Sequence, residues 1–265
     1  MYIIGELING MYGKVRDALA AKDADFIRHL ARKQVEAGAD ALDINCGPLS
    51  KDPVKDMSWL VGTVQSEVSV SLSLDSTKPA AIEAGLSACR NKAIINSSMA
   101  DEEKLSVYLD LAKKHDASLI ILTMDKRGVP QDKDRRLELA ASALEQANAA
   151  GFPQSRLFLD PVLMPINVAQ QQLYDILHVI QDLKMLSQEP VQTLVGLSNI
   201  SQGSADRSLV NRTFLVMAQA MGLSAAILDP LDQELMQALV TGEVVLNKAI
   251  YCDSYFEAYL KSRKR

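Results

Sequence analysis

Residues 71 to 96 read SLSLDSTKPAAIEAGLSACRNKAIIN. An apolar run ends at Asp75, a helical stretch covers residues 79–89, and a second apolar run ends at Asn96. Runs of Val, Ile and Leu are typical of parallel strands that are buried on both faces. A strand, a crossover helix and a second strand form the basic unit of a parallel sheet.

This unit recurs along the whole chain. Eight apolar runs end in the segments 7–9, 42–45, 73–75, 94–96, 122–125, 158–160, 196–199 and 227–229. Helical stretches are expected at 25–37, 57–68, 79–89, 101–115, 132–150, 167–186, 208–221 and 232–248, with a further helix at 254–261. Eight strand-helix repeats predict a (β/α)8 TIM barrel of the α/β class.

The composition is consistent with one barrel domain covering residues 1–265. The formal net charge is −5 and charges of both signs are interspersed, which argues against nucleic acid as a partner. Three cysteines without a CxxC or Cys/His pattern predict neither disulfides nor structural zinc, so a reducing cytoplasm is expected. Neither a leader segment nor a membrane span is expected, because no apolar run reaches about 18 residues.

Most of the apolar runs end in Asn or Asp. In a TIM barrel these ends meet at one face, where catalytic groups lie. Asp75, Asn96 and Asp160 offer acceptors and an amide, which suits a neutral hydrogen-bonding ring such as a pterin. Each Asp alone has an alternative interpretation, because Asp before Ser-Thr or before Pro also caps a helix or forms a turn.

Two further features bear on chemistry. Asn199 ends the seventh run, and its amide can donate to or accept from a ring nitrogen, although an Asx turn is the alternative interpretation. The three histidines fall within or at the end of predicted helices, and Cys46 is expected to be a packed side chain. No Ser-His-Asp order, HExxH, P-loop or GxGxxG is present, so the reaction is expected to need little covalent or metal assistance from this chain.

An ordered set of motifs then carries a resemblance across essentially the whole chain. The motifs are GELINGMYG (5–13), ALDINCGP (41–48), SLDSTKPAAIEAGL (73–86), AIINSSMADEEK (93–104), LFLDPVLMP (157–165), LVGLSNISQG (194–203), NRTFLVMAQAMGLSAAILDP (211–230) and LNKAIYCDS (246–254). In this order and spacing they resemble the methyltetrahydrofolate:corrinoid methyltransferases of the pterin-binding barrel superfamily. Dihydropteroate synthase and the folate domain of cobalamin-dependent methionine synthase are relatives of that family.

The resemblance implies a homodimeric enzyme of one-carbon metabolism that moves a methyl group between tetrahydrofolate and the cobalt of a corrinoid. Asp75, Asn96 and Asp160 match pterin-binding positions, and Asn199 matches the amide that contacts N5. Ser198, Gln202, Arg207 and Lys184 are weaker candidates for the folate site. No DxHxxG stretch is present, so the corrinoid (cobalamin) is expected on a partner protein, with no metal bound by this chain.

The direction of transfer stays open, because such enzymes serve acetyl-CoA synthesis and also O-demethylation of methoxylated compounds or use of methylamines. Two rival functions remain. A dihydropteroate synthase-like enzyme needs basic groups near a pyrophosphate, whereas the eighth strand ends ILDPLD and the second loop reads NCGPLSKD. A non-catalytic pterin-binding protein is the other alternative.

Overall fold

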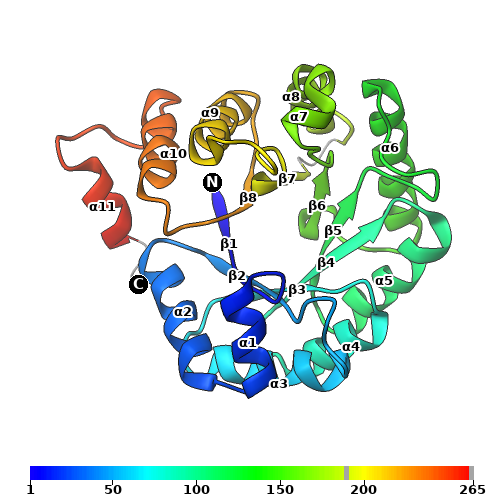
Figure 1. The fold of residues 1–265 in the computed structure, drawn as a ribbon. Helices are drawn as coiled ribbons and strands as arrows, with labels where there is room; N and C mark the ends of the chain where they lie inside the picture. Colours follow the sequence, from blue (N-terminus) through cyan, green and yellow to red (C-terminus); the bar gives the residue numbers. More distant parts are fainter. Residues whose placement is uncertain (188–190, 263–265) are drawn as a thin grey trace.

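The eight strands close into a barrel, as the sequence predicts. The structure is a computed structural model that describes residues 1–187 and 191–262. All neighbouring strands are parallel, in the order β1 to β8, and β8 pairs with β1 (Figure 1). The strands are β1 (Tyr2–Asn9), β2 (Ala41–Asn45), β3 (Ser71–Asp75), β4 (Ile94–Met99), β5 (Ser118–Leu122), β6 (Leu157–Asp160), β7 (Gln192–Gly196) and β8 (Ala225–Leu228). The prediction of a (β/α)8 barrel is therefore confirmed.

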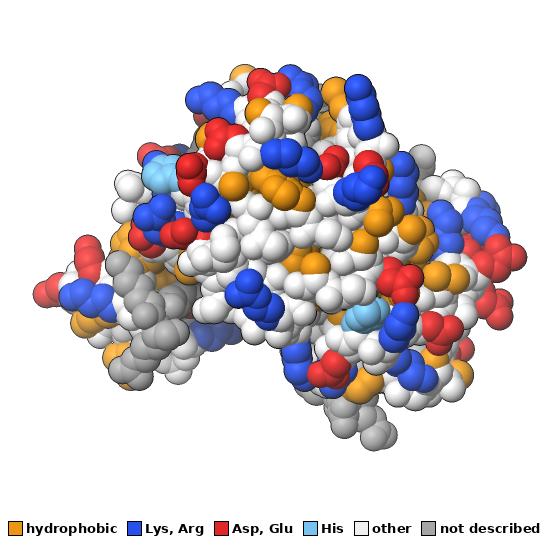
Figure 2. Space-filling view, turned by 90° about the horizontal axis from the view of Figure 1, so that it is seen from below, with side chains coloured by type: hydrophobic (Ala, Val, Ile, Leu, Met, Phe, Trp, Pro, Cys, Tyr) orange, Lys and Arg blue, Asp and Glu red, His pale blue; other side chains and the backbone are white. Residues whose placement is uncertain are grey.

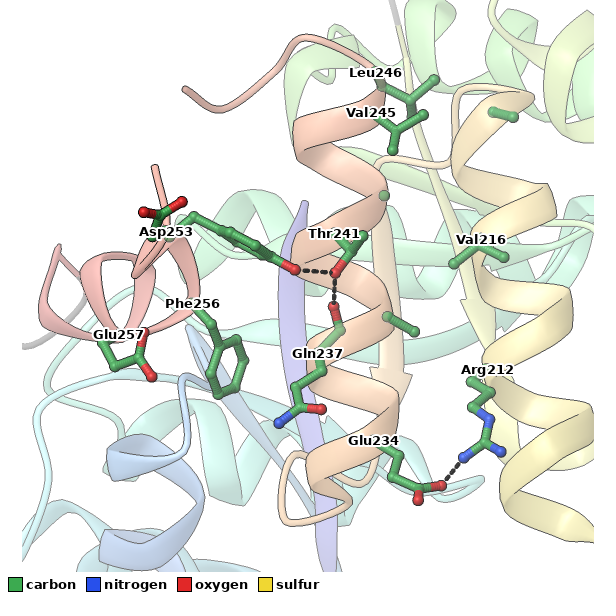
Figure 3. Close-up of a pocket in the computed structure, with 14 residues that line it drawn as sticks. Arg212, Val216, Glu234, Gln237, Thr241, Val245, Leu246, Asp253, Phe256 and Glu257 are labelled. Carbon is green, nitrogen blue, oxygen red and sulfur yellow. Dashed lines mark hydrogen bonds and ion pairs between the residues drawn. The ribbon is translucent and has the colours of Figure 1, made fainter. Parts of the chain in front are cut away.

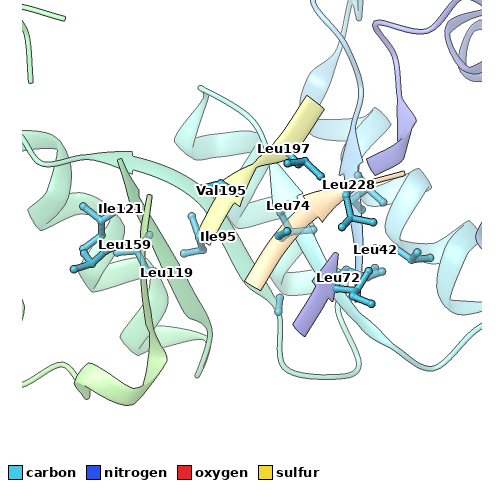
Figure 4. Packing of buried hydrophobic residues seen from close by; sticks show 14 of the residues in the cluster. Leu42, Leu72, Leu74, Ile95, Leu119, Ile121, Leu159, Val195, Leu197 and Leu228 are labelled. Atoms are coloured by element: carbon cyan, nitrogen blue, oxygen red, sulfur yellow. The ribbon is translucent and has the colours of Figure 1, made fainter. Parts of the chain in front are cut away.

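Two apolar layers hold the barrel together. Inside it, one residue from each of seven strands forms a packed cluster: Ile4, Ala41, Ile94, Ile120, Phe158, Leu194 and Ala225. On the outer face, side chains such as Leu74, Ile95 and Leu159 pack with the surrounding helices (Figure 4). Because alternate residues of a strand point to opposite faces, both layers come from the same short apolar runs.

Helices surround the barrel and return the chain to the start of the next strand (Figure 1). They are α1 (Gly13–Ala21), α2 (Ala24–Glu36), α3 (Pro53–Gln65), α4 (Pro79–Ala88), α5 (Glu102–Lys114), α6 (Lys133–Ala149), α7 (Ile166–Ala169), α8 (Leu173–Leu183), α9 (Arg207–Ala220), α10 (Gln233–Val245) and α11 (Tyr255–Ser262), with 3₁₀ turns η1 (Gln154–Arg156), η2 (Gln170–Gln172) and η3 (Leu197–Asn199). No helix of the described residues is long and apolar enough to cross a bilayer.

Three details differ from the sequence-based expectation. Helix α1 was not predicted, because it is short and its N-cap, Tyr12, has no side-chain hydrogen bond. Helix α3 begins at Pro53 rather than at Met57, since Asp52 caps its first turn and proline suits the first helical position. The stretch 167–186 was expected as one helix, but η2 interrupts it between α7 and α8.

The charged side chains are spread over the surface. Lys, Arg, Asp and Glu are interspersed across the face seen in Figure 2, with small groups of apolar side chains between them. His29 and His178 lie in helices and His115 ends α5, as expected. Cys46 is buried in the outer apolar layer, which confirms its expected packing role.

The loops after β1 and β2 cross in close contact. Gly10 N donates to the Asn45 carbonyl oxygen over 2.8 Å. A Cβ on Gly10 would lie 2.4 Å from the Cys46 carbonyl oxygen, and one on Gly47 would lie 2.8 Å from the Gly10 carbonyl. Gly47 also has a φ of +77°, which glycine adopts readily. Glycine at both positions therefore allows the two backbones to meet.

Asp232→Ala is expected to lower the stability of the barrel. Asp232 caps α10 by accepting from Leu235 N over 3.0 Å, and its second oxygen accepts from Ser208 Oγ of α9 over 2.7 Å. Losing a cap and an interhelical bond should cost about 1–2 kcal/mol of unfolding free energy. Chemical denaturation measures this. Gln237→Ala, at an exposed position of the same helix, is the control, and an equal loss there would contradict the capping role.

Candidate active site

A cavity of about 420 Å³ lies at the carboxyl ends of the strands. Every strand contributes to its lining: Glu6 and Asn9 from β1, Asp43 from β2, Asp75 from β3, Asn96 from β4, Leu122 from β5, Asp160 from β6, Gly196 from β7 and Ile227 from β8. Ser198, Asn199, Gln202 and Arg207 add the segment that follows β7. The strand-end polar residues singled out in the sequence, Asp75, Asn96, Asp160 and Asn199, therefore meet in one cavity.

Lys184 is the exception among the predicted site residues. It ends α8, and its side chain lies 3.3 Å from the position that a Cβ on Gly222 would take. Gly222 lies three residues before β8, so this contact lies at the amino ends of the strands. Because each helix runs back to that end, a residue that ends a helix lies opposite the cavity. The inclusion of Lys184 in the site was wrong.

One wall of the cavity is a hydrogen-bonded group of carboxyls and amides from β2, β3 and β4. Asp43 Oδ1 accepts from Ser73 Oγ over 2.6 Å and from Asn96 Nδ2 over 2.9 Å. Asn45 Nδ2 donates to Asp75 Oδ2 over 2.6 Å, and Asn45 Oδ1 accepts from Gly47 N. These contacts fix the orientation of each side chain before any ligand binds.

The carboxyls of the same wall have raised pKa values. Burial raises the pKa of Asp43, and the neighbouring Asp75 raises it further. Burial also raises the pKa of Asp75. Two buried carboxylates side by side repel each other, so a ligand that donates N–H groups to this wall would stabilise their charged forms.

Asp160 forms a second part of the site, on β6. It is only 7% exposed, and its Oδ1 accepts from Val162 N over 2.7 Å. Burial raises its pKa to about 7, against the lowering effect of backbone N–H donors and of Arg136. Arg136 is itself buried and donates from Nε to the Pro161 carbonyl over 3.1 Å, which anchors the loop that follows Asp160.

Asn199 lies on the third part of the site, in the turn η3 after β7. Its Nδ2 would be 3.0 Å from a Cβ on Gly196, so glycine leaves room for the amide. Arg207, at the start of α9, closes this turn by donating to Ser201 Oγ over 3.2 Å and to the Ser198 carbonyl over 3.3 Å. The Asn199 amide, which can rotate, therefore lies on a turn that Arg207 holds in place.

Sequence reasoning missed Glu6 and did not include Asp43 in the site. Glu6 Oε1 accepts from Ser198 Oγ over 2.6 Å, and burial raises its pKa to about 7. Both residues lie inside strands rather than at their ends, where the pairing of β1 with β2 shifts between Gly5 and Ile8. A charged residue inside an apolar run was the available signal for each.

Among the other hollows, one of about 520 Å³ adjoins this cavity and shares Met11 and Asp75 with it. Another, of about 820 Å³, lies between α9, α10 and α11 on the outside of the barrel (Figure 3). Its polar contacts are structural: Thr241 Oγ1 and Tyr255 Oη lie 2.7 Å apart, and Arg212 pairs with Glu234. These contacts join helices to one another. The strand-end cavity is the candidate active site, because it lies where TIM barrels place their catalytic groups.

The chain is similar in sequence to two enzymes. The chain is 28% identical over 265 residues to the methylcorrinoid:tetrahydrofolate methyltransferase of Eubacterium limosum, covering 99% of this chain and 97% of that protein. It is 29% identical over 238 residues to the methionine synthase of Mycobacterium tuberculosis, covering 85% of this chain but only 20% of that protein.

Solved structures share the fold. A dihydropteroate synthase of Coxiella burnetii in complex with pteroic acid superposes with a TM-score of 0.70 at 15% identity, over 92% of both chains. The Yersinia pestis enzyme with a pterine-sulfa conjugate gives 0.69 at 18% identity, over 93% of this chain and 94% of that one. Residues 5–229 also match the family described as "Pterin binding enzyme". This match spans β1 to the end of β8, the whole of the strand-end cavity, and the chain belongs to the family of pterin binding enzymes.

Proposed function

We propose that this protein transfers a methyl group between N5 of methyltetrahydrofolate and the cobalt of a corrinoid that a separate protein carries. The observation that carries the proposal is the likeness to the Eubacterium limosum methyltransferase over nearly the full length of both chains. The likeness to dihydropteroate synthases is below 20% identity and supports the fold alone.

The chemistry of the cavity supports a pterin as ligand. A pterin edge presents a ring N–H and an exocyclic amine as donors, beside a carbonyl and ring nitrogens as acceptors. Asp75 and Asp160 supply carboxylate acceptors, and Asn96 supplies an amide that can do both. Burial disfavours the charged forms of Asp75 and Asp160 because few water molecules can solvate them. N–H donors of a bound pterin would take the place of this water and stabilise the carboxylates.

Methyl transfer requires activation at N5, because a tertiary amine is a poor leaving group unless its nitrogen gains positive charge. In this proposal Asn199 contacts N5 and adapts to both protonation states by rotating its amide. Preorganised polar groups of this kind stabilise the transition state without reorganisation during the reaction. The corrinoid supplies the cobalt that accepts or gives the methyl group.

The partner and the pathway are also part of the proposal. The corrinoid protein would dock transiently over the open strand-end face, and the loop from Asn199 to Arg207 borders that opening. Methyl transfer would run in acetyl-CoA synthesis or in demethylation of methoxylated and methylated compounds. Three free cysteines are consistent with the reducing cytoplasm as its location.

A dihydropteroate synthase-like activity is disfavoured by the charge of the cavity. Its lining includes four carboxyl groups, from Glu6, Asp43, Asp75 and Asp160, against one cation, Arg207. A pyrophosphate leaving group would find only this one cation in the lining to pair with. Formation of dihydropteroate from a pterin pyrophosphate and aminobenzoate would favour this alternative.

The proposal is tested by anaerobic visible spectroscopy of the purified protein. One assay mixes methylcob(III)alamin with tetrahydrofolate, and the other mixes cob(I)alamin with methyltetrahydrofolate. Conversion between the two cobalamin spectra is expected in at least one direction. If neither occurs, candidate corrinoid proteins replace free cobalamin, and failure with these as well would contradict the proposal.

We also propose that the protein is a homodimer, and an apolar groove between α8 and α9 supports self-association. Leu173, Leu177, Phe214 and Met217 are among its lining residues, and Met217 is 47% exposed. Met217→Glu is expected to shift the dimer to monomer in sedimentation experiments, because burying an unpaired charge is costly. Val107→Glu, at an equally exposed position on α5, is the control. A dimer that survives Met217→Glu would exclude this groove as the interface.

A further inference from the structure

Glu6 occupies a distinct place in the cavity. It comes from β1, whereas the carboxyls of Asp43, Asp75 and Asp160 come from β2, β3 and β6. Its hydrogen bond to Ser198 Oγ joins it to the residue directly before Asn199. Glu6 therefore lies on the side of the cavity formed by β1 and the turn after β7, and it shares the cavity lining with Asn199.

The other carboxyls are held by different contacts. Asp43 and Asp75 take part in the bonded wall with Ser73, Asn96 and Asn45. Asp160 accepts from the backbone of its own loop. Glu6 instead accepts a hydrogen bond from Ser198, a hydroxyl that can accept a proton as well as donate one.

Several charged and titratable groups face Glu6 from the elements around it. Asp229 follows β8, Arg207 begins α9, Tyr12 lies in the loop after β1, and Asp43 belongs to β2. Burial is the main cause that raises the pKa of Glu6 to about 7, and Asp229 adds to it. The Ser198 bond and Arg207 act in the opposite direction. Near neutral pH both forms of Glu6 are therefore populated.

We propose that Glu6 holds the proton that N5 of the folate gains or loses during methyl transfer, with the Ser198 hydroxyl as its nearest relay. The inference rests on the proposed function and deepens it by naming a proton source within this chain. A general acid is most effective when it can be both protonated and deprotonated at the working pH.

The step balances in both directions. With methyltetrahydrofolate, the Glu6 O–H bond breaks and N5 gains the proton, so its methyl becomes a better electrophile. The cobalt(I) electron pair then forms the Co–C bond, and the C–N5 electron pair stays on nitrogen. In reverse, N5 of tetrahydrofolate attacks the methyl of methylcob(III)alamin, the Co–C bond breaks and its electron pair stays on cobalt as cobalt(I). The Glu6 carboxylate takes the proton released from N5. Solvent restores the protonation state of Glu6 after each turnover.

The first test is the pH dependence of kcat with saturating folate. Wild-type transfer from methyltetrahydrofolate should fall as pH rises through about 7, and transfer to tetrahydrofolate should rise over the same range. Glu6→Gln keeps the size and the bond to Ser198 but carries no exchangeable acid. The Glu6→Gln variant should lose this change of kcat near pH 7, which is the limb of the pH profile. Its plateau rate should be about 100-fold lower than that of the wild type. An unchanged limb in Glu6→Gln would overturn the inference.

Two neighbouring substitutions should move the limb in opposite directions. Asp229→Asn removes a negative charge that raises the pKa of Glu6, so the limb should move to lower pH. Ser198→Ala removes a donor that lowers the pKa and also removes the proposed relay, so the limb should move to higher pH and the plateau rate should fall. A merely structural role of these residues would not give opposite shifts. Glu145→Gln, at an exposed position of α6, is the control and should leave the limb in place.

A second readout needs no turnover. Infrared difference spectroscopy of the free protein follows the carbonyl band of protonated carboxyl groups as pH changes. The Glu6→Gln spectrum should lack one component that titrates near neutral pH, and Asp229→Asn should shift that component to lower pH. Absence of methyl transfer in wild type would contradict the proposed function itself. Wild-type turnover together with an unaltered carboxyl titration in Glu6→Gln would contradict only the role of Glu6.

Discussion

Asn199→Ala is expected to lower the rate of methyl transfer by about 100- to 1,000-fold, the effect seen when one preorganised transition-state donor is removed. The amide lies on η3, and Arg207 holds this turn by donating hydrogen bonds to Ser201 Oγ and to the Ser198 carbonyl. Its removal should therefore delete the contact to N5 while leaving the turn folded. The pterin edge would still meet Asp75, Asn96 and Asp160.

Single-turnover kinetics and folate titrations separate these effects. The dissociation constant of methyltetrahydrofolate should change by much less than the rate. Asn199→Asp is the companion variant, because it keeps the size of the side chain but loses the N–H donors. Equal losses of rate and affinity in Asn199→Ala would show that the residue serves binding alone.

Asp160→Asn is expected to weaken methyltetrahydrofolate binding by about 1–3 kcal/mol, because a buried donor of the pterin would lose its acceptor. The pKa of Asp160 in the free protein is raised to about 7, mainly by burial. A donor from the ligand favours the carboxylate and so lowers this pKa in the complex. Wild-type binding should therefore release a proton below pH 7, and affinity should increase between pH 5 and 7 and then level off.

Isothermal titration calorimetry across this pH range measures both quantities. Asp160→Asn should abolish the proton release that comes from Asp160 on binding. The affinity for methyltetrahydrofolate should then depend less on pH between pH 5 and 7. The sign is opposite to that expected for Glu6, whose protonated form favours transfer from methyltetrahydrofolate. An unchanged dissociation constant in Asp160→Asn would remove this residue from the ligand site.

The barrel and much of the cavity were predictable for the same physical reason. Parallel strands buried on both faces are apolar until they emerge, so the first polar residue marks the open end of each strand. Asp75 and Asp160 end β3 and β6 as this rule predicts, whereas Asn96 lies within β4, and closure of the sheet brings all three together. Asn199 lies three residues beyond the end of β7 and reaches the cavity because η3 turns inward.

The residues that escaped prediction depend on details that strand periodicity does not encode. Glu6 lies within β1 and reaches the cavity beside a shift in strand register. Lys184 lies at the end of α8, inside the stretch 167–186 that the sequence predicts as helical, so its inclusion came from the family resemblance and not from the strand pattern. Helix α1 lacks a capping side chain, so its beginning has no local signal.

The crossing of Gly10 and Gly47 limits how the molecule can diversify. Any side chain at either position would strike the backbone of the other loop, so the loops after β1 and β2 can change only together. The loops after β1 and β2 should therefore keep the same shape whichever molecule binds at the cavity. Variation that adapts the enzyme to different carrier proteins should therefore accumulate on the other loops, and swapping those loops is the practical route to redirecting its choice of carrier.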